Sequence, residues 1–140
     1  MPALPPDEQR ARVVGARVAR LATLRPDGTA RLVPITFVLW DGLVCSAVDD
    51  VKPKRSQRLA RLDDVRRDPR AAVLVDTYTE DWTQLWWVRI DGTAEVHETG
   101  ELATLARAAL ADKYPPYAAA PPQGPVLVLT PTRWAGWTAS

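Results

Sequence analysis

The residues best suited to chemistry form a basic segment between positions 52 and 61. Where a predicted strand ends and a predicted helix begins, free backbone amides and the positive end of the helix dipole stand beside these cations. Arginine adds a planar fork of donors that matches phosphate oxygens, and a serine can donate one more hydrogen bond. The segment therefore predicts either a phosphate-binding clamp or a solvated basic helix face. Its members are Lys52, Lys54, Arg55, Ser56, Arg58 and Arg61.

Other kinds of reactive site find little support. The sequence holds neither a glycine-rich dinucleotide motif nor a nucleotide-triphosphate loop. Cys45 and His97, the single residues of their types, cannot build a tetrahedral metal site, and no spacing suggests a nucleophile–histidine pair. We interpret His97 as an exposed strand residue, and the pairs Asp49-Asp50 and Asp63-Asp64 as solvated turns or caps.

Tryptophan is the second unusual feature. Trp86 and Trp87 are neighbours in a predicted strand, so one should face the core and the other should face away from it. Trp82 falls in the preceding turn, and Trp134 and Trp137 lie near the end of the sequence. Such residues serve as interface contacts or core lids as well as cofactor walls.

Length and composition predict one domain. The 140 residues are 46% hydrophobic and 25% charged, which is typical of a soluble globular chain and fits a single unit over 1–140. One cysteine cannot form an internal disulfide, so a cytoplasmic location is expected. A net charge of +1 gives no overall reason to bind nucleic acid or membranes, and no apolar run is long enough to cross a bilayer.

Turn signals divide the first half into a helix and three strands. The helix spans about 5–17, and the strands span 18–24, 29–40 and 43–48, joined by turns at 25–28 and 41–42. This order predicts an antiparallel meander. Pro34 cannot donate to a sheet ladder, so its strand should lie at an edge or carry a bulge.

The second half continues the alternation. A helix over 53–66 ends before Asp68-Pro69, and strands follow over 71–79 and 85–98, the latter interrupted at Asp91-Gly92. A helix over 101–114 precedes a proline-rich connector at 114–125 and a last strand or hairpin over 126–138. Hairpins dominate, which predicts a mostly antiparallel barrel with helices outside. The inward residues predicted for the last helix are Leu102, Leu105, Ala109 and Leu110.

Several segments together resemble a known family. The runs VARLATL (18–24), RPDG (25–28) and LVPI (32–35) are similar to the opening of the flavin- and deazaflavin-dependent oxidoreductases with the split β-barrel fold, the pyridoxamine-phosphate-oxidase-like superfamily. The run VRRDPR (65–70) continues the resemblance, and EDWTQLWWVRIDG (80–92) resembles a subgroup of probable F420-dependent enzymes. The resemblance covers about 18–137.

The resemblance implies an antiparallel split β-barrel fold. It also implies a homodimer with two cofactor sites at the subunit interface. The second strand would flank the cofactor ring, the third strand would follow near Cys45, and the basic segment would hold the phosphate and an anionic tail. Tryptophans of the partner chain would complete the pocket. The implied cofactor-binding residues are Leu32, Val33, Pro34, Ile35, Ser46, Lys52, Lys54, Arg55, Ser56, Arg58, Trp87 and Trp134.

The function implied by the resemblance is hydride transfer between coenzyme F420 and an unidentified small organic substrate. FMN in the same site is the alternative, and a non-catalytic flavin or tetrapyrrole carrier is a third possibility. The basic signature of pyridoxamine-phosphate oxidases proper is not found in 131–140, which argues against that activity. Trp82 and the connector at 114–125 would lie near the substrate opening, or serve only as a surface turn and a spacer.

Overall fold

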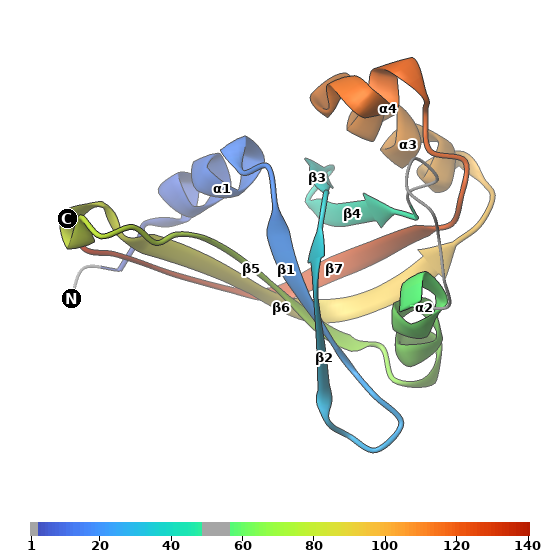
Figure 1. The fold of residues 1–140 in the computed structure, drawn as a ribbon, viewed down its shortest axis with the longest axis horizontal. Helices are drawn as coiled ribbons and strands as arrows, with labels where there is room; N and C mark the ends of the chain where they lie inside the picture. Colours follow the sequence, from blue (N-terminus) through green and yellow to red (C-terminus); the bar gives the residue numbers. More distant parts are fainter. Residues whose placement is uncertain (1–2, 49–56) are drawn as a thin grey trace.

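The computed structural model describes residues 3–48 and 57–140 (Figure 1). Seven strands and four α-helices lie in this part of the chain. The helices are α1 (Pro6–Gly15), α2 (Gln57–Arg67), α3 (Glu101–Lys113) and α4 (Pro115–Ala119), with a single 3-10 turn, η1 (Trp82–Gln84). The strands are β1 (Ala19–Leu24), β2 (Ala30–Ile35), β3 (Val38–Trp40), β4 (Leu43–Ala47), β5 (Arg70–Thr77), β6 (Trp86–His97) and β7 (Val126–Thr138).

All strand pairs are antiparallel, and the sheet order is β2-β1-β5-β6-β7-β4-β3. The first and last strands of this order, β2 and β3, are separated in sequence by only Thr36 and Phe37. Two residues span about 10 Å between the flanking strands, so the sheet curls until its edges approach. The mostly β, antiparallel split-barrel fold is confirmed.

The pairings of the predicted antiparallel meander are confirmed, since β1 pairs with β2 and β3 pairs with β4, but its middle strand is not continuous. The stretch at 29–40 breaks into β2 and β3 at Thr36-Phe37, and β4 lies between β3 and β7 in the sheet. The prediction that the strand carrying Pro34 lies at an edge or carries a bulge is confirmed, because β2 lies at the edge of the sheet. The hairpin at 41–42 is also confirmed, since Asp41 and Gly42 have φ of 50° and 77°.

The sheet has one buried face and one open face. On β1, β5 and β6 alternate residues are buried, and they pack with Val13 of α1 and Leu62 of α2 in the main core. The other residues of these strands share the opposite side, as their register shows. We call this side the open face. Its members include Arg20, Ala22, Leu32, Pro34, Ala72, Leu74, Trp87 and Arg89.

Two expectations for the C-terminal half need correction. On α3, Ala103, Ala106 and Leu110 carry the buried side, while Leu105 is 38% exposed rather than inward. The proline-rich connector is not a plain spacer, because it forms α4 and buries Tyr114 and Tyr117 in a second core cluster. In the described part of the chain, no helix is long and apolar enough to cross a membrane.

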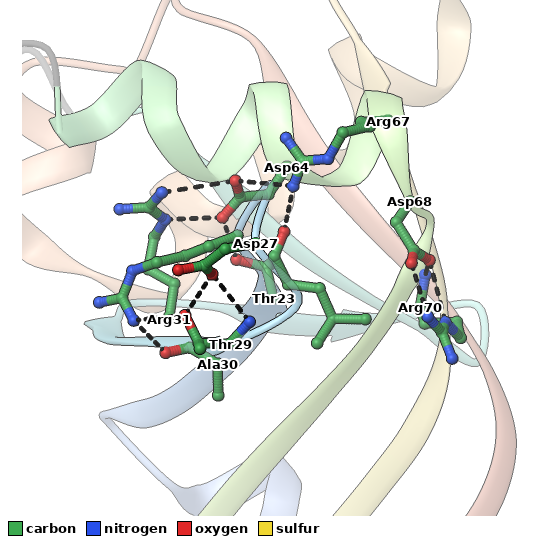
Figure 2. A network of polar contacts seen from close by, with 11 residues as sticks. Thr23, Asp27, Thr29, Ala30, Arg31, Asp64, Arg67, Asp68 and Arg70 are labelled. Atoms are coloured by element: carbon green, nitrogen blue, oxygen red, sulfur yellow. Dashed lines mark hydrogen bonds and ion pairs between the residues drawn. The ribbon is translucent and has the colours of Figure 1, made fainter.

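A buried carboxylate fastens α2 to the β1–β2 hairpin (Figure 2). Asp64 is 1% exposed, and its oxygens accept from Arg31 Nε at 2.6 Å, Thr23 Oγ1 at 2.7 Å and Arg67 Nη2 at 3.3 Å. The interpretation of Asp63-Asp64 as a solvated pair therefore holds only for Asp63. Burial raises the pKa of Asp64, but hydrogen bonds from these three donors outweigh it and hold the pKa below its ordinary value.

We expect Asp64→Asn to lower the free energy of unfolding by about 2–3 kcal/mol, because it leaves partly buried guanidinium groups without their counter-charge. Urea denaturation measures the change. Asp63→Asn, whose side chain is 71% exposed, is the matched control and should shift stability by no more than about 0.5 kcal/mol.

Acid should remove this contribution. The stability that Asp64 supplies is complete above its unfolded pKa of about 3.9 and disappears as the pH falls through its lower folded pKa. The gap between the parent protein and Asp64→Asn should therefore narrow below about pH 4. A gap that stays constant down to about pH 2 would contradict the ion-pair account.

Candidate functional site

An apolar cavity of about 570 Å³ lies on the open face of the sheet. The register places Ala22 opposite Leu32, and Arg20 opposite both Pro34 and Leu74, so these side chains stand together on one side of three strands. Ligand cavities of this size, ~300–1,000 Å³, accept a cofactor ring or a small organic molecule. The described lining is Arg20, Ala22, Leu32, Val33, Pro34, Ala72, Val73, Leu74 and Arg89.

The wall formed by β2 suits a flat ring with a polar edge. Leu32 is 69% exposed, which is a large apolar surface without a covering partner in the described chain. Since β2 is an edge strand, some of its backbone N–H and C=O groups point away from the sheet without a strand partner. A ligand seated here would meet apolar side chains on its flat side and backbone polar groups at its rim.

The charged side chains in the described lining of this cavity are both arginines. Its described lining contains Arg20 and Arg89 and no acid. Arg89 is partly neutralised by Asp91, with 3.6 Å between Nε and Oδ1, and its guanidinium lies 5.5 Å from the ring centre of Trp87. Arg20 makes no hydrogen bond or ion pair within the described residues. An anionic ligand is therefore favoured over a cationic one.

A second cavity, of about 660 Å³, adjoins the first, and Arg20 lines both. We call it the arginine cavity. The end of α1 and the start of β1 supply three arginines, and the ends of β5 and β6 supply aromatic and polar groups. The described lining is Ala11, Arg12, Gly15, Ala16, Arg17, Val18, Arg20, Asp76, Thr77, Tyr78 and Trp86.

The fold agrees with the protein family that the sequence matches. The chain matches the pyridoxamine 5'-phosphate oxidase family over residues 5–138. The chain belongs to this family. No curated protein matches it.

Solved structures support the same fold. A conserved hypothetical protein from Mycobacterium tuberculosis has a TM-score of 0.79 at 20% identity, over 97% of this chain and 86% of that one. A FAD-binding protein from Mesorhizobium loti has a TM-score of 0.69 at 21% identity, over 96% and 93%. A heme-binding protein from Mycobacterium smegmatis has a TM-score of 0.72 at 22% identity, over 97% and 60%.

Within the pyridoxamine 5'-phosphate oxidase fold, the predicted ring-flanking residues divide between the two faces. Leu32, Val33 and Pro34 line the apolar cavity. Ile35 is 5% exposed and belongs to the main core instead. Ser46 is buried on β4 and donates to the carbonyl oxygen of Thr36 at 2.7 Å, so within this chain it supports the β2–β3 crossover rather than lining either cavity.

The two predicted tryptophans lie on opposite faces. Trp87 stands on the open face beside Arg89, whereas Trp134 pairs in register with Ile90 on the buried side and lies 5.9 Å from the guanidinium of Arg10 on α1. One chain therefore does not bring them together. Their predicted role as walls contributed by a partner chain stays a prediction.

The predicted phosphate clamp lies outside the described residues. This applies to Lys52, Lys54, Arg55 and Ser56, and to the side chain of Arg58, whose backbone belongs to α2. Their role in holding a phosphate stays a prediction.

No nucleophile or metal centre is apparent in the described part of the chain. Burial raises the pKa of Cys45 from 9.0 to about 11, so its thiol stays protonated at neutral pH. No group of three or more His, Cys, Asp or Glu side chains among the described residues could hold a metal ion.

The crossover from β2 to β3 is held by a polar cluster that the sequence did not reveal. The hydroxyl of Tyr114 accepts from the Phe37 N–H at 3.0 Å and lies 2.9 Å from the Phe37 carbonyl oxygen. Lys113 Nζ donates to the same carbonyl at 2.9 Å. The hydroxyl groups of Tyr117 and Thr36 form a hydrogen bond of 2.9 Å. The cluster holds the backbone at the point where β2 ends.

Lys113 gives this cluster a pH dependence. Burial, and secondly the charge of Arg17, lower the pKa of Lys113 from 10.5 to about 8. The unfolded chain keeps that proton up to about pH 10.4, so unfolding takes up a proton between these values and the free energy of unfolding rises with pH there.

We therefore expect the parent protein to gain stability relative to Lys113→Met as the pH rises from about 7.5 to about 9.5. Urea denaturation of both proteins at several pH values measures the difference, and comparison with the variant cancels the other titrating groups. Parallel stability curves would contradict the lowered pKa.

Proposed function

We propose that the protein is an oxidoreductase that binds coenzyme F420 in the apolar cavity and transfers hydride to or from a small organic substrate, with FMN as the alternative cofactor. The observation that carries the proposal is the cavity itself. Leu32, Val33 and Pro34, which the family resemblance assigns to the ring, line a hollow that is apolar on its wall and cationic at its side.

The residues present fit such a group. A deazaflavin or flavin has a flat ring with one polar edge and a phosphate-bearing side chain. The apolar wall of β2 suits the flat side, the edge-strand backbone suits the polar rim, and Arg20 and Arg89 favour an anion. Lys52, Lys54 and Arg55 would hold the phosphate. When bound, the cofactor supplies the two-electron chemistry.

The chain's own contribution is then binding, orientation and exclusion of water. The described lining of the apolar cavity contains no acid, histidine, cysteine or hydroxyl side chain that could act as a general acid or base. This is consistent with a reaction whose chemistry is supplied by the cofactor, while the protein binds the cofactor and the substrate and orients them.

We further propose that a second copy of the chain covers the open face. Leu32 is 69% exposed at the centre of an apolar wall, and Trp87 is half-buried on the same side. Pairing of two open faces would bury this surface and turn each cavity into a site shared by two chains. It would also supply the water-excluding lid that one chain lacks.

The carrier alternative has weaker support. A heme-binding protein shares the fold, but the described lining of the apolar cavity offers no histidine, cysteine, methionine or tyrosine to ligate a haem iron. The charged groups in its described lining are arginines, which do not favour haem over another anionic organic cofactor. A flavin or deazaflavin needs no axial ligand from the protein. Steady turnover with either cofactor would exclude a purely carrying role.

Titration with F420 and with FMN, followed by fluorescence, tests the cofactor. We expect the double variant Lys54→Ala/Arg55→Ala to bind the cofactor more weakly by about 3 kcal/mol, since each charged hydrogen bond contributes ~1.5–3 kcal/mol. Arg10→Ala/Arg133→Ala removes the same charge elsewhere and should bind normally. If neither cofactor binds the parent protein, the proposed function is wrong; equal affinity of both double variants would move the phosphate site elsewhere.

The variant Leu32→Asp tests the shared site. A carboxylate on the wall should weaken both cofactor binding and self-association, while the unfolding free energy of the monomer changes by no more than about 0.5 kcal/mol, because the residue is exposed. Sedimentation velocity measures the assembly. Leu105→Asp, on α3 away from the open face, is the control. A dimer that survives Leu32→Asp unchanged would place the interface on another surface.

A further inference from the structure

Arg20 is the group that joins the two cavities. On β1 it stands opposite Pro34 and Leu74, so its guanidinium rises between apolar side chains of the open face. Two other arginines of this region form ion pairs: Arg31 with Asp64 at 2.6 Å, and Arg89 with Asp91 at 3.6 Å. Arg20 has no such partner among the described residues, so its N–H donors are available to a ligand.

Arg12 supplies a second available guanidinium. Its guanidinium lies 5.0 Å from the ring centre of Trp86, within cation–π range, and both residues line the arginine cavity. Arg12 makes no hydrogen bond within the described residues. Arg17 is partly committed, because it donates to the Lys113 carbonyl oxygen at 2.7 Å. Asp76 is the one acid in the cavity's described lining, against three arginines.

The surfaces next to these guanidiniums are aromatic and apolar. Trp86 and the 68% exposed Tyr78 line the arginine cavity, and Leu74 and Pro34 flank Arg20 on the other side. Such a site favours a flat apolar body that carries one anionic group. A carboxylate matches the two-pronged donor geometry of arginine.

We propose that Arg20 and Arg12 bind the carboxylate of a small aromatic acid, and that this is the substrate class of the site. This inference rests on the proposed function, because it places the acid in the arginine cavity beside a cofactor ring held in the apolar cavity. The cofactor's own phosphate is the other oxyanion that Arg20 could meet. Under the proposed function the basic segment at 52–58 would hold that phosphate, which would leave Arg20 for the substrate.

Isothermal titration of the cofactor-saturated protein tests the site with two probes of the same shape. The anionic probe is 2-naphthoate and the neutral probe is 2-naphthalenemethanol. We expect the parent protein to bind the anion about tenfold more tightly, as charge-assisted hydrogen bonds to one arginine require. Arg20→Gln should abolish this preference, Arg20→Lys should keep part of it, and Arg20→Glu should reverse it in favour of 2-naphthylmethylammonium.

The control is Arg133→Gln, which removes an exposed arginine that lines neither cavity and should leave the preference intact. Unfolding curves of all variants check that each is folded. Equal binding of the two naphthalene probes by the parent protein, or an unchanged preference in Arg20→Gln, overturns the proposal. So does a loss of cofactor affinity or of self-association in Arg20→Gln with no change in probe preference.

Failure of the proposed function gives a different result. If the parent protein binds neither F420 nor FMN, the proposed oxidoreductase function is wrong. Titration of the cofactor-free protein with the two probes then still decides whether Arg20 selects an aromatic carboxylate. A preference for the anion that depends on Arg20 would then stand alone as a binding site for aromatic acids.

Discussion

The two-residue crossover at Thr36-Phe37 is the constraint on which the rest of the structure depends. It carries the chain from one edge of the sheet to the other, and the short span forces the sheet to curl. Phe37 is fully buried, and its backbone N–H and C=O are both satisfied by side chains at the end of α3, Lys113 and Tyr114. Without those partners, closing the sheet would leave buried backbone groups unpaired.

Closure also explains why one face of the sheet is filled and the other open. The concave side is packed by the strands' own alternate residues together with α1 and α2, and Asp64 fixes α2 to the hairpin that carries Leu32. The helices therefore complete the core and leave Leu32 on the open face of β2 exposed. The exposed wall follows from the architecture, and the same wall is where the family resemblance places the cofactor ring.

The sequence predicted elements well and contacts between distant elements poorly. Local signals such as Pro34 and Asp41-Gly42 indicated an edge strand and a hairpin, because each acts through backbone geometry within a few residues. The interruption predicted at Asp91-Gly92 is instead a register shift within a continuous β6. The pairing of β4 with β7 and the burial of Asp64 depend on long-range contacts that no local pattern specifies. The expectation of one continuous strand over 29–40 and the interpretation of Asp64 as solvated were wrong for that reason.

The candidate site shows the same division. The run at 32–35 was predicted to flank a cofactor ring through the resemblance alone. In the structure, strand alternation turns Leu32 and Pro34 toward the cavity and Ile35 into the core. Arg12, Arg17 and Arg20 were missed, because in an arginine-rich chain single arginines carry little information. What distinguishes Arg20 is the absence of an acid opposite it among the described residues. The register of β1 between β2 and β5 reveals this, since it places Pro34 and Leu74 directly opposite Arg20.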